Sequence, residues 1–448
     1  MPSSPSHLCR RHLPTANFTR YRLHSTKTQA IPSLHWSAST CTTTRRPRIG
    51  GWTRSLQTIK QNTNLGSNDS TFVGPDSSKR GLETRVREPF TILFCGRDAF
   101  SCMVFKHLYE ARDVWQGLHI ATNPDVRSGR NGSRLDISPL KTLGETLEVP
   151  VHTIPKEKTA FRHWLPPPPF APSNSISTHD IAHRDSSHVL VTASFGRILP
   201  SPFLRLFPET QCLNVHPSLL PAYRGPAPIQ RALMAAETET GVCVIQMGEV
   251  RRKVGKLVDQ GGVWAIEKMG ILGDAAFTDI QTKLAESGGK LLVEVLRDML
   301  SGKARCTPQA PLTTETPYAP AITAMDSTIV FSAHTAKSLV RLERAIGHQR
   351  ALTLPSALPD GRSVSLAGLR AVTPTLGLQM SDMCPGTAKY LPHADALLVT
   401  CAGGEVLSVD RLQTQDRAML RAKDWWNGVK GMGLVKDGIF SFNTAGQQ

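Results

Sequence analysis

Four short apolar segments, separated by stretches with helical spacing, most constrain how this chain can fold. They span residues 91–95, 118–122, 188–193 and 241–247. The first ends at Gly96 and is followed by apolar residues at helical spacing, which indicates a strand, a tight turn and an amphipathic helix. Apolar strands that alternate with helices predict a mostly parallel sheet covered on both faces. We therefore expect an α/β, Rossmann-like domain over residues 86–305, with an amphipathic helix at 284–299.

The segment from 326 to 448 has a different character and predicts a second, smaller domain. After an expected helix at 335–346, it consists of short apolar segments interrupted by Pro385-Gly386 and Gly403-Gly404. Short strands separated by such turn residues are typical of a small β-barrel or sandwich.

Two further segments are expected to lie outside regular structure. Residues 165–187 begin with a run of four prolines, which fits neither a helix nor a central strand and so predicts a Pro- and Ser-rich surface insertion. Residues 306–325 are rich in Pro and Thr, and we assign them to the linker between the two domains.

The formal net charge of +16 is concentrated near the N-terminus. Eight Arg and two Lys precede Asp69, the first acidic residue. An acid-free segment rich in Arg, Ser and Thr is typical of an organelle transit peptide, whereas a secretory signal needs an unbroken apolar segment. We predict that residues 1–85 are a disordered mitochondrial presequence and linker, which places the protein in the mitochondrial matrix. A disordered basic tail or a misassigned start is the alternative.

The sequence indicates neither a membrane span nor a metal site. No run of about 18 apolar residues without charge occurs. The nine cysteines form no Cys-x-x-Cys pair, and no His cluster has metal-ligand spacing. We expect a protein without a metal, a membrane or a disulfide framework, and we expect it to be a monomer.

The segment from 212 to 229 carries the residues best suited to chemistry. A short strand there places Asn214 and His216 on one face, because side chains two positions apart in a strand point the same way. An Asn amide can donate to a developing oxyanion, and a neutral imidazole can accept a proton from an attacking amine. By spacing alone, a hydrogen-bonded loop pair without catalytic function is at least as good an explanation.

The whole string, Asn-x-His followed by Ser-Leu-Leu-Pro and Arg-Gly-x-x-Pro-Ile, resembles the motif of the 10-formyltetrahydrofolate-dependent formyltransferases. Within that family it is most similar to the branch that formylates methionyl-tRNA. The resemblance covers about residues 90–430 and includes Phe94-Cys95-Gly96, the stretch 194–200 and the stretch 422–428. It implies a formyl transfer from 10-formyltetrahydrofolate to initiator methionyl-tRNA in mitochondrial translation, and a C-terminal domain that resembles an oligonucleotide-binding (OB-like) barrel.

The same resemblance implies the site residues. Asn214 and His216 would hold the formyl oxygen, and Asp259 would orient His216 or move a proton. The segment 248–255 makes the distance to Asp259 longer than the family pattern, and it is either a real loop or an error in the gene model. Folate is expected to contact residues in two nearby segments, namely Phe195, Ile198, Leu199, Ser218, Leu219, Leu220 and Pro221.

A basic loop after the second strand is the candidate contact to tRNA. Arg127, Arg130 and Arg134 lie there among Gly and Ser, and a flexible cationic loop can order on phosphates. The resemblance implies that this loop and the C-terminal domain bind tRNA, while a merely solvated loop is the alternative. Two other functions stay open: formyl transfer to another amine, such as a purine precursor or an amino sugar, and tRNA binding without catalysis.

Overall fold

The computed structural model describes residues 88–129, 132–171, 186–248, 258–373, 380 and 382–442. Several sequence-based predictions therefore fall outside the described residues. They are the presequence and linker at 1–85, Arg130, most of the Pro- and Ser-rich insertion, and all of the segment 248–255 except Gly248. The described ends of the insertion, 165–171 and 186–187, contain no helix or strand.

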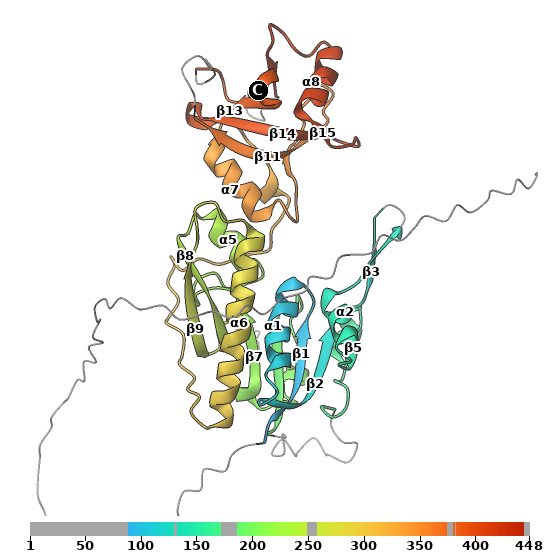
Figure 1. Cartoon of the computed structure of the whole chain (residues 1–448), viewed down its shortest axis with the longest axis vertical. Coiled ribbons are helices and arrows are strands. Elements are labelled where there is room, and N and C mark those ends of the chain that lie inside the picture. The colour runs from blue at the N-terminus through green and yellow to red at the C-terminus, as the bar shows by residue number, and fades with distance from the viewer. Residues whose placement is uncertain are drawn as a thin grey trace, which may run out of the picture. The chain divides into compact units, whose positions relative to one another are not determined.

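The first domain is built on a seven-stranded sheet with the order β5-β2-β1-β6-β7-β8-β9 (Figure 1). The parallel strands are β1 (Phe90–Gly96), β2 (Trp115–Thr122), β5 (Val151–Thr153), β6 (His188–Ala193) and β7 (Cys212–His216). β8 (Glu239–Gln246) is antiparallel to β7, and β9 (Val263–Gly270) is antiparallel to β8. The predicted Rossmann-like, mostly parallel sheet is confirmed.

Both faces of the central part of this sheet are covered, which explains why strands such as β1 and β6 are apolar along most of their length. Ile92 and Phe94 of β1 belong to the apolar cluster that includes α1 (Ala99–Glu110) and α6 (Phe277–Leu300). Leu93 and Cys95 belong to a second cluster on the opposite face. That cluster includes side chains from α3 (Lys158–Arg162) and α4 (Ser201–Leu204).

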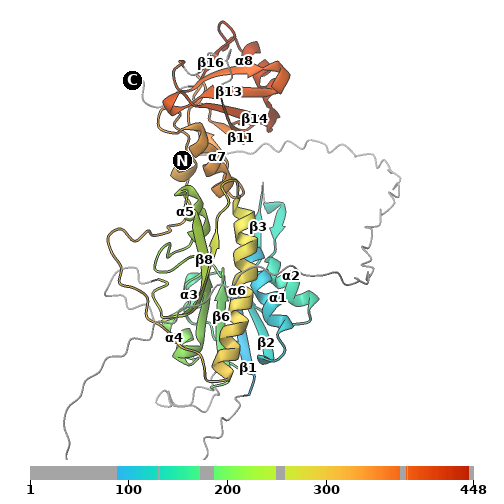
Figure 2. The same ribbon diagram turned by 60° about the vertical axis from the view of Figure 1, so that its left-hand side comes forward.

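The described part of this domain contains three further helices. They are α2 (Pro139–Thr146), α5 (Pro228–Met234) and the short 3₁₀ helix η3 (Glu209–Gln211). Figure 2 shows α6 beside α1 along the sheet. α6 has 24 residues and begins at Phe277, ahead of the expected 284. None of the described helices combines the length and apolar character needed to cross a membrane.

The second domain is an antiparallel sheet with the order β10-β11-β14-β13-β12-β16. Its strands are β10 (Leu352–Leu354), β11 (Val364–Val372), β12 (Thr387–Leu391), β13 (Ala396–Thr400), β14 (Val406–Thr414) and β16 (Phe440–Ser441), with β15 (Leu420–Arg421) paired to β14. Two helices, α7 (Ala336–Ile346) and α8 (Ala422–Gly431), and the 3₁₀ turns η4 (Met325–Ser327), η5 (Pro392–Ala394) and η6 (Ala402–Gly404) accompany it. The small β-domain is confirmed, and its hydrogen-bonded path stays open among the described residues.

The linker expected at 306–325 is hydrogen bonded to the first domain. Thr307 and Val263 exchange two backbone hydrogen bonds of 2.7 and 2.9 Å. At the far end of the linker, Asp326 accepts two hydrogen bonds from the Arg231 guanidinium of α5, at 2.6 and 3.0 Å. The linker is therefore bonded to the first domain near both ends rather than being a free spacer.

Two half-buried histidines in neighbouring strands predict a pH-dependent stability. Nδ1 of His119 in β2 lies 3.4 Å from Nε2 of His152 in β5. Burial lowers the pKa of both rings from the usual 6.5, and the charge of His152 lowers the pKa of His119 further. As the pH falls below 6.5, the unfolded chain takes up protons that the folded protein binds less readily, so the free energy of unfolding decreases.

We therefore expect His119→Gln to reduce the fall in Tm between about pH 7.5 and about pH 5.5, because one of the depressed groups is removed. Thermal unfolding followed by circular dichroism at both pH values measures this. His393→Gln, at an exposed position, is the matched control. An unchanged fall in Tm in His119→Gln would show that this pair does not set the acid sensitivity.

Candidate active site

β7 places Asn214 and His216 on one face of the sheet. Leu213 and Val215 point to the cluster that includes α6, whereas Cys212 belongs to the cluster on the opposite face. Because side chains alternate along a strand, Asn214 and His216 share the face of Cys212. The spacing argument made from the sequence is confirmed for this pair.

Asp259 joins these two side chains from the connection between β8 and β9. Its Oδ1 accepts a hydrogen bond of 3.4 Å from Asn214 Nδ2, and its Oδ2 lies 3.8 Å from Nδ1 of His216. The backbone N–H of Gly225 also donates to Oδ2, at 3.1 Å. The three residues expected to be catalytic therefore converge, even though an unusually long segment precedes Asp259.

The amide of Asn214 has a defined orientation. The Thr192 hydroxyl, on the neighbouring strand β6, donates to Asn214 Oδ1 at 2.7 Å. The amide oxygen is thus occupied, and the NH₂ group points toward Asp259, which accepts from it. An amide nitrogen has two N–H groups, so one remains to donate to a substrate oxygen.

The ring of His216 is buried and has a polar neighbour at each nitrogen. Its Nε2 lies 3.1 Å from the backbone carbonyl oxygen of Tyr223, and its Nδ1 faces Asp259. A proton on Nε2 is donated to the Tyr223 carbonyl, which leaves Nδ1 as the nitrogen that can exchange a proton with a substrate. The distance of 3.8 Å from Nδ1 to Asp259 Oδ2 exceeds a direct hydrogen bond, so the two groups are neighbours without a direct hydrogen bond.

The segments expected to contact folate lie on either side of this polar group. Phe195 and Leu199 are buried in the apolar cluster of the same face, whereas Ile198 is 67% exposed. Asn123 donates to the Phe195 carbonyl at 2.8 Å and so fixes the start of that segment.

In the second segment, the Ser218 hydroxyl donates to the Ala222 carbonyl, and Leu220 is buried beside Cys243 and Ile245. Leu219 packs against Gly241, where an added Cβ would lie 2.3 Å from a Leu219 methyl carbon, and a cis peptide bond joins Leu220 to Pro221. These side chains therefore mostly support the loop itself.

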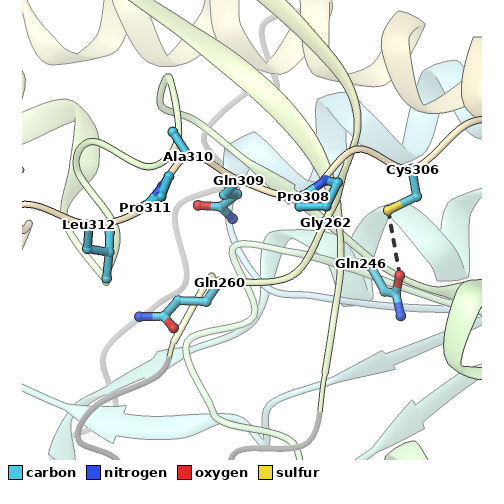
Figure 3. A pocket seen from close by; sticks show the side chains of 9 residues that line it. All are labelled: Gln246, Gln260, Gly262, Cys306, Pro308, Gln309, Ala310, Pro311 and Leu312. Atoms are coloured by element: carbon cyan, nitrogen blue, oxygen red, sulfur yellow. Dashed lines mark hydrogen bonds between the residues drawn. The ribbon is translucent and has the colours of Figure 1, made fainter.

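A cavity of about 640 Å³ lies beside the Asp259 connection (Figure 3). The linker forms one wall of it, and the lining residues are Gln246, Gln260, Gly262, Cys306, Pro308, Gln309, Ala310, Pro311 and Leu312. None of the residues expected to bind folate lines it. Among the described residues, no group of three or more His, Cys, Asp or Glu side chains is arranged to hold a metal ion.

The basic loop is a β-hairpin in its described part, where a flexible loop was expected. β3 (Val126–Ser128) pairs antiparallel with β4 (Arg134–Asp136), with Arg127 opposite Leu135 and Val126 opposite Asp136. Opposed residues share a face, so Arg127 and Arg134 lie on opposite faces of the hairpin. Both side chains are exposed. The described part of this segment is therefore paired strand rather than irregular loop.

Two residues that contact the site were not found from the sequence. Thr192 was detectable in principle, because it is a polar residue within an apolar strand. Gln309 donates from its amide nitrogen to the carbonyls of Asp259 and Gly261, both at 2.8 Å. It lies in a Pro- and Thr-rich linker, 50 residues from Asp259, and no local pattern connects the two.

Comparisons with known proteins show which family this chain belongs to. The family model described as formyl transferase matches residues 145–296, and the model of the formyl transferase C-terminal domain matches residues 321–430. A methionyl-tRNA formyltransferase of Myxococcus xanthus is 32% identical over 340 residues, which is 76% of this chain and 95% of that protein. The mitochondrial methionyl-tRNA formyltransferase of Saccharomyces cerevisiae is 29% identical over 361 residues, 75% of this chain and 88% of that protein.

Among solved structures, HypX from Aquifex aeolicus is similar with a TM-score of 0.49 and 16% identity, over 77% of this chain and 48% of that chain. The extent and identity of the match to the Myxococcus xanthus protein decide the assignment. The chain therefore belongs to the formyltransferase family, among relatives named methionyl-tRNA formyltransferase.

Proposed function

We propose that this protein transfers the formyl group of 10-formyltetrahydrofolate to the α-amino group of methionyl-tRNA. The observation that carries the proposal is the convergence of Asn214, His216 and Asp259 in a chain with these relatives. The folate is a co-substrate that supplies an activated formyl carbon bound to N10. The protein must therefore orient the two substrates and stabilise the charges that develop between them.

Asn214 has the clearest role in this reaction. As the amine nitrogen bonds to the formyl carbon, negative charge develops on the formyl oxygen. Asn214 donates its remaining amide N–H to that oxygen, and the Thr192 hydroxyl keeps the amide from rotating. Such a donor, held in place before the reaction, stabilises the transition state without reorganisation.

His216 and Asp259 act on the proton of the attacking amine. His216 contributes through Nδ1, which donates to the formyl oxygen when protonated and accepts the amine proton when neutral. The Asp259 carboxylate lies beside Nδ1 and orients the ring. The proton lost by the amine is delivered to N10 as the bond between N10 and the formyl carbon breaks, so that protons and charges balance.

The substrates are proposed to meet this group from both sides. The backbone and side chains of Phe195, Ile198 and Leu199, together with the loop 218–221, hold the folate. The hairpin β3–β4 and the C-terminal domain hold tRNA.

The basic, acid-free N-terminal segment and the similarity to a yeast mitochondrial enzyme support action in the mitochondrial matrix. We propose that the protein acts there as a monomer.

The reaction is tested by measuring formyl transfer to charged initiator methionyl-tRNA. We expect transfer by the wild-type protein and a fall in kcat on the order of 10²- to 10⁴-fold in His216→Ala, because proton transfer at Nδ1 is lost. His163→Ala, at an exposed position of the same domain, is the matched control. Transfer to a small amine but not to tRNA would contradict the acceptor, and tRNA binding without any transfer would contradict catalysis.

The role of the hairpin is tested by its two described arginines. Each of Arg127→Ala and Arg134→Ala removes one phosphate contact, so we expect weaker tRNA binding and a slope of log K against log salt that is lower by about 1. Because the two side chains lie on opposite faces, their losses should add in the double variant. Arg162→Ala, exposed on α3, should leave tRNA binding unchanged. Unaltered binding in both hairpin variants would show that the hairpin is only solvated.

A further inference from the structure

The linker between the domains contacts the connection that carries Asp259. The two backbone hydrogen bonds between Thr307 and Val263 align the linker beside the first residue of β9. Two residues further on, the Gln309 amide nitrogen donates to the carbonyls of Asp259 and Gly261, each at 2.8 Å. Figure 3 shows Gln309 on the linker next to the segment with Gln260 and Gly262.

The same linker also supports the loop that contacts His216. The carbonyl of Pro317 accepts a hydrogen bond of 2.7 Å from the N–H of Tyr223, whose own carbonyl faces His216 Nε2. Ala319 donates to the Arg224 carbonyl at 2.8 Å. The next residue, Gly225, donates its N–H to Asp259 Oδ2. The linker therefore holds the backbone on both sides of the catalytic group.

The backbone around Asp259 has little room to move. Its φ is +57°, in the left-handed region that Asp and Asn tolerate better than other residues with a side chain. Gly261 lies so close to β8 that an added Cβ would be 1.7 Å from the Gln246 carbonyl oxygen. One amide group that binds the carbonyls at 259 and 261 together fixes the turn between them.

We infer that Gln309 is a positioning residue for Asp259. By fixing the backbone of this turn it sets the direction of the carboxylate toward Asn214 and His216. The inference rests on the proposed function and deepens it. The linker continues to Asp326, whose carboxylate forms an ion pair with Arg231. The segment that leads to the C-terminal domain is thus itself a component of the formyl-transfer site.

The test compares Gln309→Leu, which keeps the size of the side chain but has no donor, with Gln260→Leu. Gln260 lines the same cavity and, among the described residues, its side chain makes no hydrogen bond. We expect kcat for formyl transfer to fall about 10- to 100-fold in Gln309→Leu, with KM for both substrates nearly unchanged, because only the geometry of the catalytic group is lost. In an Asp259→Asn background, Gln309→Leu should cause no further loss.

A readout independent of activity is hydrogen–deuterium exchange of the peptide that contains residues 258–263. Exchange should increase in Gln309→Leu and stay at the wild-type rate in Gln260→Leu. Unchanged exchange, an equal loss of kcat in both variants, or an additive loss on the Asp259→Asn background would each overturn the inference. A wild-type protein that transfers no formyl group would contradict the proposed function, and the exchange experiment would still test the contact.

Discussion

The carboxylate of Asp259 is the group on which the arrangement of the candidate active site depends. Its two oxygens face Asn214 and His216 of β7 and accept the N–H of Gly225 from the following loop. It therefore joins the strand β7 to the loop that follows it and to the described end of the connection between β8 and β9. Its side chain is only 13% exposed, and charge interactions are stronger in such partly desolvated surroundings than in water.

The parallel sheet determines which segments can reach this group. The carboxyl ends of parallel strands lie at one edge of a sheet, and ligands bind there in open α/β folds. The segments that follow β1, β2 and β6 share this edge with the end of β7. The Ser194 hydroxyl, after β6, donates to Asp98, which follows β1 and also caps α1. The proposed folate contacts and the hairpin β3–β4 thus come from neighbouring segments of one edge.

Much of the fold was predictable because its information is local. Apolar strands such as β1 and β6, the helix α7 and the shared face of Asn214 and His216 follow from short patterns in the sequence. The catalytic roles, by contrast, came from resemblance to a family. What could not be predicted depends on tertiary contacts: the hydrogen bond from Thr192 to Asn214 needs the register of β6 and β7, and Gln309 meets Asp259 across 50 residues. The early start of α6 is set by burial of Phe277 and Ile280, which precede the clearest apolar spacing.

The central claim is that Asn214, His216 and Asp259 work as one unit, with Asp259 as the connecting group. A double-mutant cycle on the rate of single-turnover formyl transfer, using Asn214→Ala, Asp259→Asn and the double variant, tests this most directly. Residues that act as a unit are strongly non-additive, so the double variant should be about as slow as the slower single variant. Losses that multiply in the double variant would show that the two residues act independently, and would contradict the account.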